Sequence, residues 1–539
     1  MAEAPDVAVV VAPAFREAME PWIRYRQRQG HRVAVVAGSR AMPDICEELR
    51  GLARGGRLRY VVLVGDADPA MHTDPDVRAR CVPTGHAEAK VNVLWESERH
   101  IATDNPYGDL TGDGVPELAV GRLPANCPTE LRRMVAKTLA YEQSADFGAW
   151  RRQVNVVAGV GGFGWLADSV LESAARYFLT QHVPAEYAVS MTHASWRSPY
   201  SPDPRLFHHT TLRRLNEGSL FWVYIGHGFP YGLDRVQTPG GTFHILANAD
   251  AEKLDGAHAP PIALFLACYT GAIDAWEDCL AERMLAQEGG PVAIVAGSRV
   301  TMPYGLTVLA TELIDQCFRQ HPATLGDALL VAKQRMTAES DPADQQRAMI
   351  DTIARTVSPA PDRLAEERAE HVLLMNLLGD PLLRLRYPKP VELHTADRVR
   401  AGDRLRVEGI SPIDGVGKVE LVVARGRLTF APPARRSFPI TPDGLSELQE
   451  TYERANDGRL AAAQVVTHGG RFEVELPVPA GVTGPCHVRV FLAGANDYAA
   501  GSRELEIGLG SRVPTPPHPG PVAMEAPEQV HSPRGAVRR

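Results

Sequence analysis

Two stretches of this 539-residue chain decide the fold: LFWVYIGHG at residues 220–228 and IALFLACYTG at residues 262–271. Each begins with a continuous apolar run and then changes to glycine and polar residues. Such runs are typical of strands that are buried on both faces of a parallel sheet. In these sheets, ligands bind outside the carboxyl ends of the strands. The two stretches therefore predict a site that contains His227 and Cys268.

Strand-like runs of the same kind occur from residue 6 to about residue 386 and alternate with amphipathic segments such as Phe15–Gln29 and Thr129–Glu142. The further runs are Val7–Val11, Val33–Ala37, Arg59–Val64, Val154–Gly159 and Val292–Ala296. Parallel strands need long crossover connections, which helices usually supply. The alternation therefore predicts two α/β subdomains side by side, at residues 1–148 and 149–388, built on helix-covered parallel strands.

The pattern changes after Pro388. Short runs separated by turn residues follow, at Arg404–Glu408, Lys418–Ala424, Phe472–Leu476 and His487–Ala493. This spacing, with few helical segments, predicts a separate β-sandwich at residues 389–510. The polar segment 432–463 is typical of a long insertion, and the proline-rich segment 511–539 is typical of a disordered tail.

Composition excludes several classes of protein. The formal net charge is −8, with 57 basic and 65 acidic residues, whereas nucleic-acid-binding domains are normally basic. No run of about 18 apolar residues occurs, so the sequence predicts no membrane-spanning helix. The first residues lack the basic segment of a secretory signal, and the seven cysteines include no CxxC pair. We therefore expect a reducing, cytoplasmic setting, with neither a disulfide framework nor a structural zinc site.

The two strand ends carry the residues of a nucleophile–base pair. His227 lies between two glycines, which leave room for a substrate, and Cys268 ends the next apolar run. The thiolate is the reactive form of cysteine, and a nearby histidine can take its proton and later protonate the leaving group. The backbone N–H groups of Gly228 and Cys268 are candidates for an oxyanion hole. Together these residues favour nucleophilic catalysis over a structural cysteine and a core histidine.

Two other glycine-rich segments indicate alternative sites. Gly159–Gly164 fits the G-x-G-x-x-G pattern of dinucleotide-binding loops, but the next apolar stretch does not end in the acidic residue that would bind a ribose. A tight strand-to-helix turn is the other interpretation. Asp109, Thr111 and Asp113 precede a glycine as in a calcium loop, although the closing glutamate position is Val120. A Ca²⁺ site at these three residues and a turn capped by their side chains both stay open.

His208 and His209 are adjacent in the sequence. Adjacent side chains of an extended segment point in opposite directions. We therefore do not expect these two histidines to share a metal ion.

Six motifs, in their order along the chain, resemble those of the gingipain-type cysteine peptidases. They are YVVLVGDA (60–67), PELAVGRLP (116–124), YIGHG (224–228), ACYTG (267–271), VAGSR (295–299) and NLLGDP (376–381). The resemblance covers roughly residues 6–386 and implies a caspase-like fold followed by an immunoglobulin-like domain. It also implies an endopeptidase that acts on polypeptides. We expect no required cofactor, and Ca²⁺ stays possible at the loop of Asp109, Thr111 and Asp113 described above.

The resemblance assigns catalytic roles to three residues. It implies that Cys268 is the nucleophile and that His227 is the general base and acid. It further implies an upstream carboxylate that orients the histidine, for which Glu117 is the matching position.

The resemblance also bears on substrate recognition. Gingipains that cleave after arginine or lysine use an acidic pocket, for which Glu130 is the candidate here. Ser298 and Arg299, at a third strand end, are candidates for further substrate contacts. Only six of the 57 basic residues are lysines, so an enzyme that cleaves after arginine would carry many sites in itself, Arg435 and Arg436 among them.

Two functions other than proteolysis stay open on the sequence alone. The α/β part could be a catalytically silent scaffold whose β-sandwich binds a partner. It could also be a nucleotide-dependent enzyme that uses Gly159–Gly164.

Overall fold

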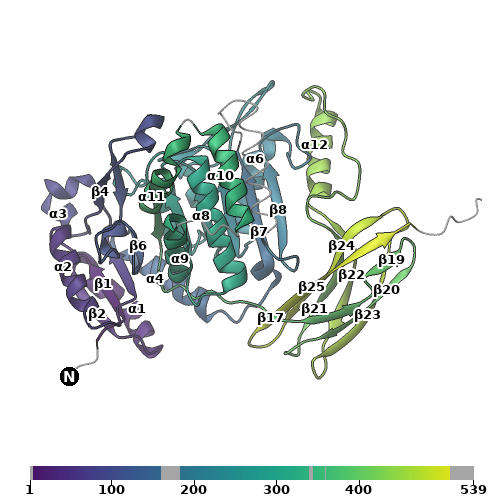
Figure 1. The fold of residues 1–539 in the computed structure, drawn as a ribbon, viewed down its shortest axis with the longest axis horizontal. Coiled ribbons are helices and arrows are strands. Elements are labelled where there is room, and N and C mark those ends of the chain that lie inside the picture. The colour runs from purple at the N-terminus through teal and green to yellow at the C-terminus, as the bar shows by residue number, and fades with distance from the viewer. Residues whose placement is uncertain (1–3, 160–181, 339–343, 359, 510–539) are drawn as a thin grey trace, which may run out of the picture.

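The computed structural model describes residues 4–159, 182–338, 344–358 and 360–509, which form an α/β part and a β-sandwich (Figure 1). The rest of the dinucleotide-like pattern after Gly159 and the expected tail at 511–539 lie outside the described residues.

A ten-stranded sheet forms the centre of the α/β part, in the order β2-β1-β3-β6-β16-β15-β14-β9-β7-β8. The strands are β1 (Val7–Val11), β2 (Val33–Ala37), β3 (Tyr60–Val64), β6 (Ala119–Leu123), β7 (Gln153–Ala158), β8 (Ala188–His193), β9 (Phe221–Ile225), β14 (Ile262–Leu266), β15 (Ala293–Gly297) and β16 (Met375–Leu378). Seven of them coincide with the predicted runs. The other three, β6, β8 and β16, contain polar residues such as Arg122 and Asn376 that interrupt the apolar pattern although they are buried.

The strand directions divide this sheet into two halves. All neighbouring pairs are parallel except β15 and β16, whose register runs antiparallel from Ile294 opposite Leu378 to Gly297 opposite Met375. We call β2, β1, β3, β6 and β16 the N-terminal half, and β15, β14, β9, β7 and β8 the C-terminal half. Because the two halves run in opposite directions, the carboxyl ends of the strands of one half lie at one edge of the sheet. The carboxyl ends of the other half lie at the opposite edge.

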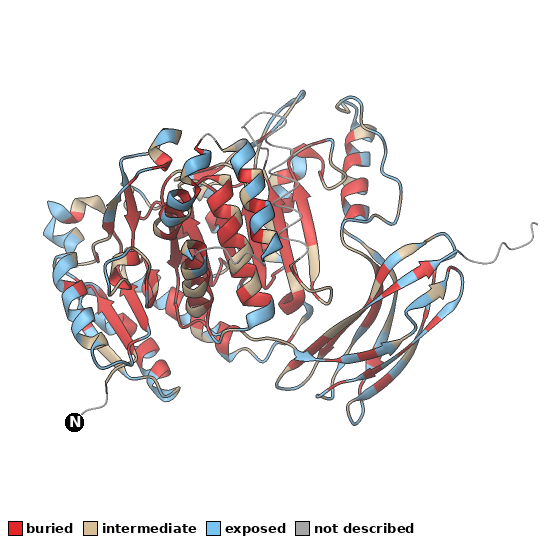
Figure 2. Ribbon diagram, viewed as in Figure 1, coloured by how far each residue is buried: buried red, intermediate tan, exposed pale blue. Residues whose placement is uncertain are grey.

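Helices cover the sheet, and α8, α9, α10 and α11 lie over one face (Figure 1). The helices are α1 (Arg16–Arg28), α2 (Met42–Ala53), α3 (Pro75–Arg78), α4 (Pro128–Gln143), α6 (Phe207–Asn216), α7 (Leu280–Ala286), α8 (Pro303–Asp315), α9 (Leu325–Thr337), α10 (Gln345–Val357) and α11 (Leu364–Leu374). Strands such as β1, β3 and β14 are buried along their whole length, and β1 has the colour of buried residues in Figure 2. Continuous burial on both faces explains their unbroken apolar runs. Among the described residues, no helix is long and apolar enough to span a bilayer.

A buried ion network holds the N-terminal helices to the turn after β16. The Arg26 guanidinium of α1 pairs with Glu142 of α4 at 2.9 Å and with Asp380 at 2.5 Å. Trp22 Nε1 also donates to Asp380. All three charged side chains are almost completely buried, and buried charges persist only when they are paired and hydrogen-bonded. The network gives Asp380 of the NLLGDP motif a structural role.

A hairpin from the N-terminal half reaches the strand ends of the C-terminal half. It consists of β4 (Gly85–Glu88) and β5 (His100–Thr103), which lie between β3 and β6 in the sequence. The Ser298 hydroxyl after β15 donates to Ala102 O at 2.6 Å, and Arg299 Nε donates to His100 O at 3.1 Å. Residues of the N-terminal half therefore border the predicted site.

The remaining strands form a β-sandwich, as the sequence predicts. They are β17 (Lys389–Pro390), β18 (Glu392–Thr395), β19 (Arg398–Arg400), β20 (Arg404–Ile410), β21 (Val416–Val423), β22 (Arg459–Val466), β23 (Arg471–Pro477), β24 (Gly484–Ala493) and β25 (Tyr498–Gly508). One sheet has the order β17-β25-β24-β21-β22 with β19 beside β25, and the other has the order β18-β20-β23. Burial alternates along β20, as expected where one face meets the core.

The polar segment at 432–463 contains helix α12 (Pro442–Ala455), which lies near the β8 edge of the large sheet (Figure 1). The Asn456 side chain accepts from Met191 N at 2.7 Å and donates to Met191 O at 2.9 Å, as a neighbouring strand would. Tyr452 is fully buried, and its hydroxyl lies 3.0 Å from Thr192 Oγ1. The segment thus covers an edge strand, which would otherwise expose unpaired backbone groups.

Candidate active site

His227 and Cys268 project from the ends of neighbouring parallel strands. Ile225 of β9 lies opposite Leu266 of β14, and each functional residue follows two positions later. Adjacent strands lie about 4.8 Å apart, so the two side chains emerge side by side. Both residues are half-buried, which leaves them accessible within a supported site. The structure therefore brings the predicted pair together.

The turn after β9 depends on Gly226. Its φ of +154° is in a region that favours glycine, and a Cβ at this position would lie 2.8 Å from the Tyr224 hydroxyl oxygen. That hydroxyl donates to His227 O at 2.9 Å, and Asp234 N donates to the same carbonyl at 3.1 Å. Because Tyr224 is buried in the sheet, these bonds fix the backbone that carries the imidazole.

Gly228 allows the two strand ends to meet. A Cβ on Gly228 would lie 2.5 Å from the Cys268 carbonyl oxygen, closer than real Cβ atoms approach. Any side chain here would push the peptide of the nucleophile away. The Gly-His-Gly motif is thus explained by one glycine that turns the chain and one that permits backbone contact.

The Cys268 thiol receives hydrogen bonds from a residue that the sequence reasoning missed. Thr301 N donates to Cys268 Sγ at 3.3 Å, and the Thr301 hydroxyl lies 3.7 Å from the same sulfur. Cys268 Sγ also lies 3.6 Å from Thr301 O, to which the thiol can donate. Thr301 lies two residues beyond the VAGSR motif, so the end of β15 was the available signal, but the motif stopped short of the residue that faces the thiol.

The chain turns sharply just after the nucleophile. Tyr269 has φ +58°, a left-handed conformation that costs a non-glycine residue about 1–2 kcal/mol. Tyr269 N donates to Arg299 O at 3.1 Å, and its hydroxyl donates to Glu98 at 2.8 Å. Strained backbone of this kind persists where surrounding contacts hold it, often at functional sites.

Comparison with known proteins decides the family. A model of Peptidase family C25 matches residues 1–386. The chain belongs to this family. Lys-gingipain W83 of Porphyromonas gingivalis is 22% identical over 302 residues, which are 54% of the C25 chain and 15% of that relative. The C25 chain thus matches only a small part of the length of this curated relative.

Two solved structures share the fold of the C25 chain. The crystal structure of the Arg-specific cysteine proteinase gingipain R covers 94% of the C25 chain and 98% of its own, with 17% identity and a TM-score of 0.53. The complex of the Porphyromonas gingivalis RgpB pro- and mature domains covers 93% and 100%, with the same identity and TM-score. These matches confirm the predicted α/β fold with a C-terminal β-sandwich, and the family match confirms the resemblance.

The structure corrects the role predicted for Glu117. Its carboxylate accepts from Leu110 N at 2.7 Å and from the Thr111 hydroxyl at 3.0 Å, within its own loop. β6, which begins two residues later, is separated from β9 by β16, β15 and β14, a path of about 19 Å across the sheet. Glu117 therefore does not orient His227. The resemblance assigned Glu117 by its place in the PELAVGRLP motif, and a motif does not record that three strands separate β6 from β9.

The structure also corrects the substrate contacts predicted for Ser298 and Arg299. Ser298 is fully buried, and its hydroxyl is bound to the β5 carbonyl of Ala102. The Arg299 guanidinium is bound to both oxygens of Asp274, at 2.8 and 2.5 Å. Burial would raise the pKa of Asp274, but hydrogen bonds from His86 and Arg299 hold it well below its ordinary value. Both residues therefore fasten the hairpin and the loop after Cys268.

Glu130 has a helix-capping contact. Its carboxylate accepts from Asn126 N at 2.8 Å, ahead of the start of α4. The Asn126 side chain in turn donates to Asp278, which lies in the loop after Cys268. The capping contact accounts for the glutamate in the first turn, and its role in a specificity pocket stays a prediction.

The predicted calcium loop is a compact turn. Asp109, Asp113 and Glu117 place one oxygen each within 4.8 Å of one another. Asp109 accepts from Gly112 N at 2.6 Å and from Gly114 N at 2.9 Å. The hydroxyl of Thr111, a predicted ligand, donates to Glu117 at 3.0 Å, so Thr111 lies beside this group of carboxylates.

Proposed function

We propose that the chain is a cysteine endopeptidase, with Cys268 as the nucleophile and His227 as the general base and acid. The observation that carries this proposal is the meeting of the two strand ends in a member of a peptidase family: Gly228 packs against the Cys268 carbonyl, and Thr301 N donates to the thiol. This arrangement supports a thiolate beside an imidazole, which is what acyl transfer from a peptide requires.

The reaction follows from these groups. His227 accepts the thiol proton, and Cys268 Sγ attacks the peptide carbonyl carbon to form a tetrahedral oxyanion. His227 then donates the proton to the departing amine, which leaves a thioester on the cysteine. A water molecule, deprotonated by His227, attacks the thioester, and collapse of the second oxyanion releases the carboxylic acid and the thiol.

The backbone around the site suits the proposed oxyanion hole. Asp234 N donates to His227 O, so His227 and Asp234 occupy a hydrogen-bonded position of the ladder between β10 (Gly228–Phe229) and β11 (Gly232–Leu233). Positions alternate along an antiparallel ladder, which leaves the next residue, Gly228, at a non-hydrogen-bonded position. Its N–H is therefore available to an oxyanion beside the Cys268 N–H, as the proposal requires.

Exposed aromatic side chains next to the site support a polypeptide substrate. Phe229 and Tyr231 follow His227, and Trp276 follows Cys268, with exposed fractions of 54%, 44% and 77%. Leu280 N donates to Pro230 O at 2.7 Å, which joins the two loops. Exposed apolar groups on adjoining loops are typical of a binding surface, here for an extended chain.

A basic residue before the scissile bond is the proposed preference. The similar proteins carry names that state Lys or Arg specificity. In this chain the Glu98 side chain is 56% exposed and contacts the residue that follows the nucleophile. Glu98 and Glu130 are thus the candidate acids for a basic side chain. The proposed reaction needs no cofactor, and Ca²⁺ at the 109–117 loop stays a prediction.

A peptide-library assay with the Cys268→Ala variant tests the proposal. The wild type should cleave peptides after arginine or lysine, with and without Ca²⁺, and Cys268→Ala should lose activity by about 10⁴-fold or more. Cys127→Ala is the matched control, because Cys127 is also a half-buried thiol but lies at the start of α4. It should retain activity.

Two outcomes would contradict different parts of the proposal. Equal activity of the wild type and Cys268→Ala would refute cysteine catalysis and favour a silent scaffold, as would alkylation of Cys268 by iodoacetamide at the rate of an ordinary thiol. Cleavage without a basic preference would refute only the specificity. All seven cysteines are free, which supports work in a reducing compartment such as the cytoplasm, and cell fractionation tests that location.

A further inference from the structure

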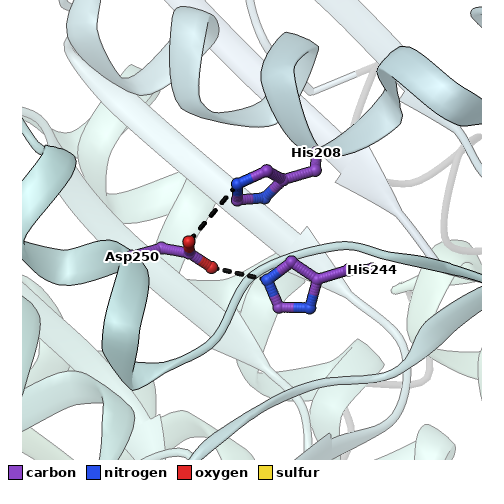
Figure 3. A group of neighbouring side chains, drawn as sticks. All are labelled: His208, His244 and Asp250. Atoms are coloured by element: carbon purple, nitrogen blue, oxygen red, sulfur yellow. Dashed lines mark hydrogen bonds and ion pairs between the residues drawn. The ribbon is translucent and has the colours of Figure 1, made fainter.

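A second group of reactive side chains lies outside the proposed catalytic pair. It consists of His208 on α6, His244 at the end of β13 (Gly241–His244) and Asp250 in the short helix η7 (Asn248–Lys253). Figure 3 shows the three side chains pointing toward one another from these elements. β13 pairs with β12 (Arg235–Thr238), and β12, β13 and η7 all belong to the segment between His227 and Cys268. The group therefore ties that segment to α6.

The distances in this group suit a small metal ion. One donor atom of each residue lies within 4.8 Å of the others. His208 Nε2 lies 3.3 Å from Asp250 Oδ1, and His244 Nε2 lies 2.5 Å from Asp250 Oδ2. Ligands of a tetrahedral zinc ion, with bonds of about 2.0–2.2 Å, lie about 3.3 Å from one another. A small rotation of the His244 ring would lengthen the distance from its Nε2 to Asp250 Oδ2 to this value, which His208 Nε2 already has from Asp250 Oδ1.

The hydrogen bond at His208 Nδ1 orients its ring as in a metal ligand. The Nδ1 of His208 lies 2.9 Å from Ile245 O, and a carbonyl oxygen only accepts, so Nδ1 carries the proton. In a neutral imidazole, Nε2 then presents a lone pair to the anionic Asp250 oxygen. That contact is repulsive unless Nε2 binds a second proton or a metal ion. A histidine whose second nitrogen donates to a backbone carbonyl is also the usual arrangement of a metal ligand.

The two rings are held close to one carboxylate. The His208 and His244 ring centroids lie 4.6 Å apart, and both rings contact Asp250. Asp250 is buried and also accepts from Ala247 N at 2.9 Å and from Lys253 Nζ at 2.8 Å.

We propose that His208, His244 and Asp250 bind one divalent transition-metal ion of the zinc class. Two imidazole nitrogens and one carboxylate suit zinc, whereas calcium prefers oxygen ligands throughout. The histidine side chains are 26% and 39% exposed, so water can occupy a fourth position. The ion would cross-link α6, β13 and η7, and so would stabilise the segment that joins the two members of the catalytic pair.

His209 provides the matched control. It follows His208 on α6 and is exposed, because adjacent residues of a helix point about 100° apart. The sequence-based prediction placed His208 and His209 in an extended segment, whereas both lie on α6, from which His208 approaches residues 36 and 42 positions later in the chain.

Zinc titration of the metal-depleted protein tests the proposal. The Cys268→Ala variant serves as the parent, because it removes the catalytic thiol as a competing ligand. After treatment with EDTA, calorimetric titration with Zn²⁺ at neutral pH should show one site per chain. Outer-shell partners alone change metal affinity by about 10–100-fold. Adding His244→Gln should therefore weaken binding by about 100-fold or more, and adding His209→Gln should leave it unchanged.

Thermal unfolding of the same proteins separates loss of the site from loss of the fold. Zn²⁺ should raise the Tm of the parent and of the His209→Gln protein, and should not raise that of the His244→Gln protein, whose circular dichroism should match the parent. Absence of saturable Zn²⁺ binding by the parent would overturn the proposal. Equal binding by the His244→Gln and His209→Gln proteins would overturn it too, and the three side chains would then be hydrogen-bonded only. Neither result would affect the proposed peptidase.

Discussion

The two halves of the ten-stranded sheet are built from the same kind of buried strand, but the residues around their strand ends have different surroundings. In the N-terminal half, Asp66 after β3 is buried and paired with Arg80 at 3.2 Å, and Arg122 of β6 is buried against Asp104 at 2.7 Å. In the C-terminal half, the corresponding strand ends carry His227 and Cys268, both half-buried.

The difference shows that a polar residue at a strand end is not enough to make a site. The Arg122 guanidinium also donates to the carbonyl oxygens of Gly65 and Val82, at 2.9 and 2.8 Å. These N–H donors are therefore bound to other groups of the protein and do not face a substrate. Among the described residues, Cys268 Sγ makes weak hydrogen bonds with Thr301, and the residue is half-buried, so the thiol keeps an accessible face. A catalytic side chain must be held in position by its neighbours and must still have atoms that can contact a substrate.

Removal of the His227 imidazole should have the largest effect on the difference between the two halves. We expect His227→Ala to lower kcat/KM for peptide hydrolysis by about 10³-fold or more, because no other group would take the thiol proton. His31→Ala is the control, since His31 is a half-buried histidine of the N-terminal half that bonds to Asp6 at 2.8 Å. It should stay within about tenfold of the wild type. Retention of activity in His227→Ala would remove the distinction between the halves.

The next largest effect should be on stability in the N-terminal half. We expect Arg122→Met to lower the free energy of unfolding by about 3–5 kcal/mol, because it leaves the Asp104 carboxylate buried without its partner. Urea unfolding measures the change. Arg59→Met, which breaks an exposed pair with Asp327, should cost less than about 1 kcal/mol. Similar losses in both variants would contradict a structural role specific to Arg122.

A pair of glycine substitutions sharpens the comparison. In Gly228→Ala the new Cβ would displace the Cys268 carbonyl, so kcat/KM should fall by about 100-fold. Gly65, after β3, has φ +142°, and a Cβ there would lie 2.7 Å from Arg80 O. Gly65→Ala should cost about 1–3 kcal/mol of stability while the folded enzyme keeps its kcat. Loss of kcat in both variants would show that the halves are coupled.

The smallest expected effect concerns the ion pair of the C-terminal half. Because the folded pKa of Asp274 is depressed, the unfolded chain binds more protons in acid, and the pair stabilises the fold above the ordinary carboxyl range, near pH 4. Asp274→Asn should therefore lower stability by about 1–3 kcal/mol at pH 7. The difference from the wild type should begin to shrink as the pH falls below about 4 and should vanish only as the pH falls through the depressed pKa of folded Asp274. Urea unfolding at several pH values measures it, and a difference that does not depend on pH would exclude this linkage.

Local sequence patterns were sufficient to predict part of the fold and the two central residues of the site. Unbroken apolar runs predicted seven strands of the large sheet, and alternation predicted the sandwich, because burial on one or two faces leaves a direct trace in composition. His227 and Cys268 could be named because each follows such a run. Strands β6 and β16 were not predicted, because buried Arg122 and Asn376 interrupt their apolar runs.

Other parts of the site depend on contacts between distant segments. Thr301 meets Cys268 from 33 residues away, and His208 meets His244 and Asp250 through the packing of α6 against the hairpin. Glu117, Ser298 and Arg299 looked like site residues because of their positions in motifs, but they are held within loops and against the β4–β5 hairpin.

The amino-acid sequence by itself determined which segments are buried strands, where the β-sandwich begins, and that a histidine and a cysteine end two adjacent apolar runs. Only the tertiary structure decided that β16 pairs antiparallel with β15, which reverses half of the sheet, and which side chains face the thiol. The physical reason is that an apolar run records burial but not direction. A strand is equally buried whether its neighbour is parallel or antiparallel, so the identity of its neighbours is set by packing across the whole domain.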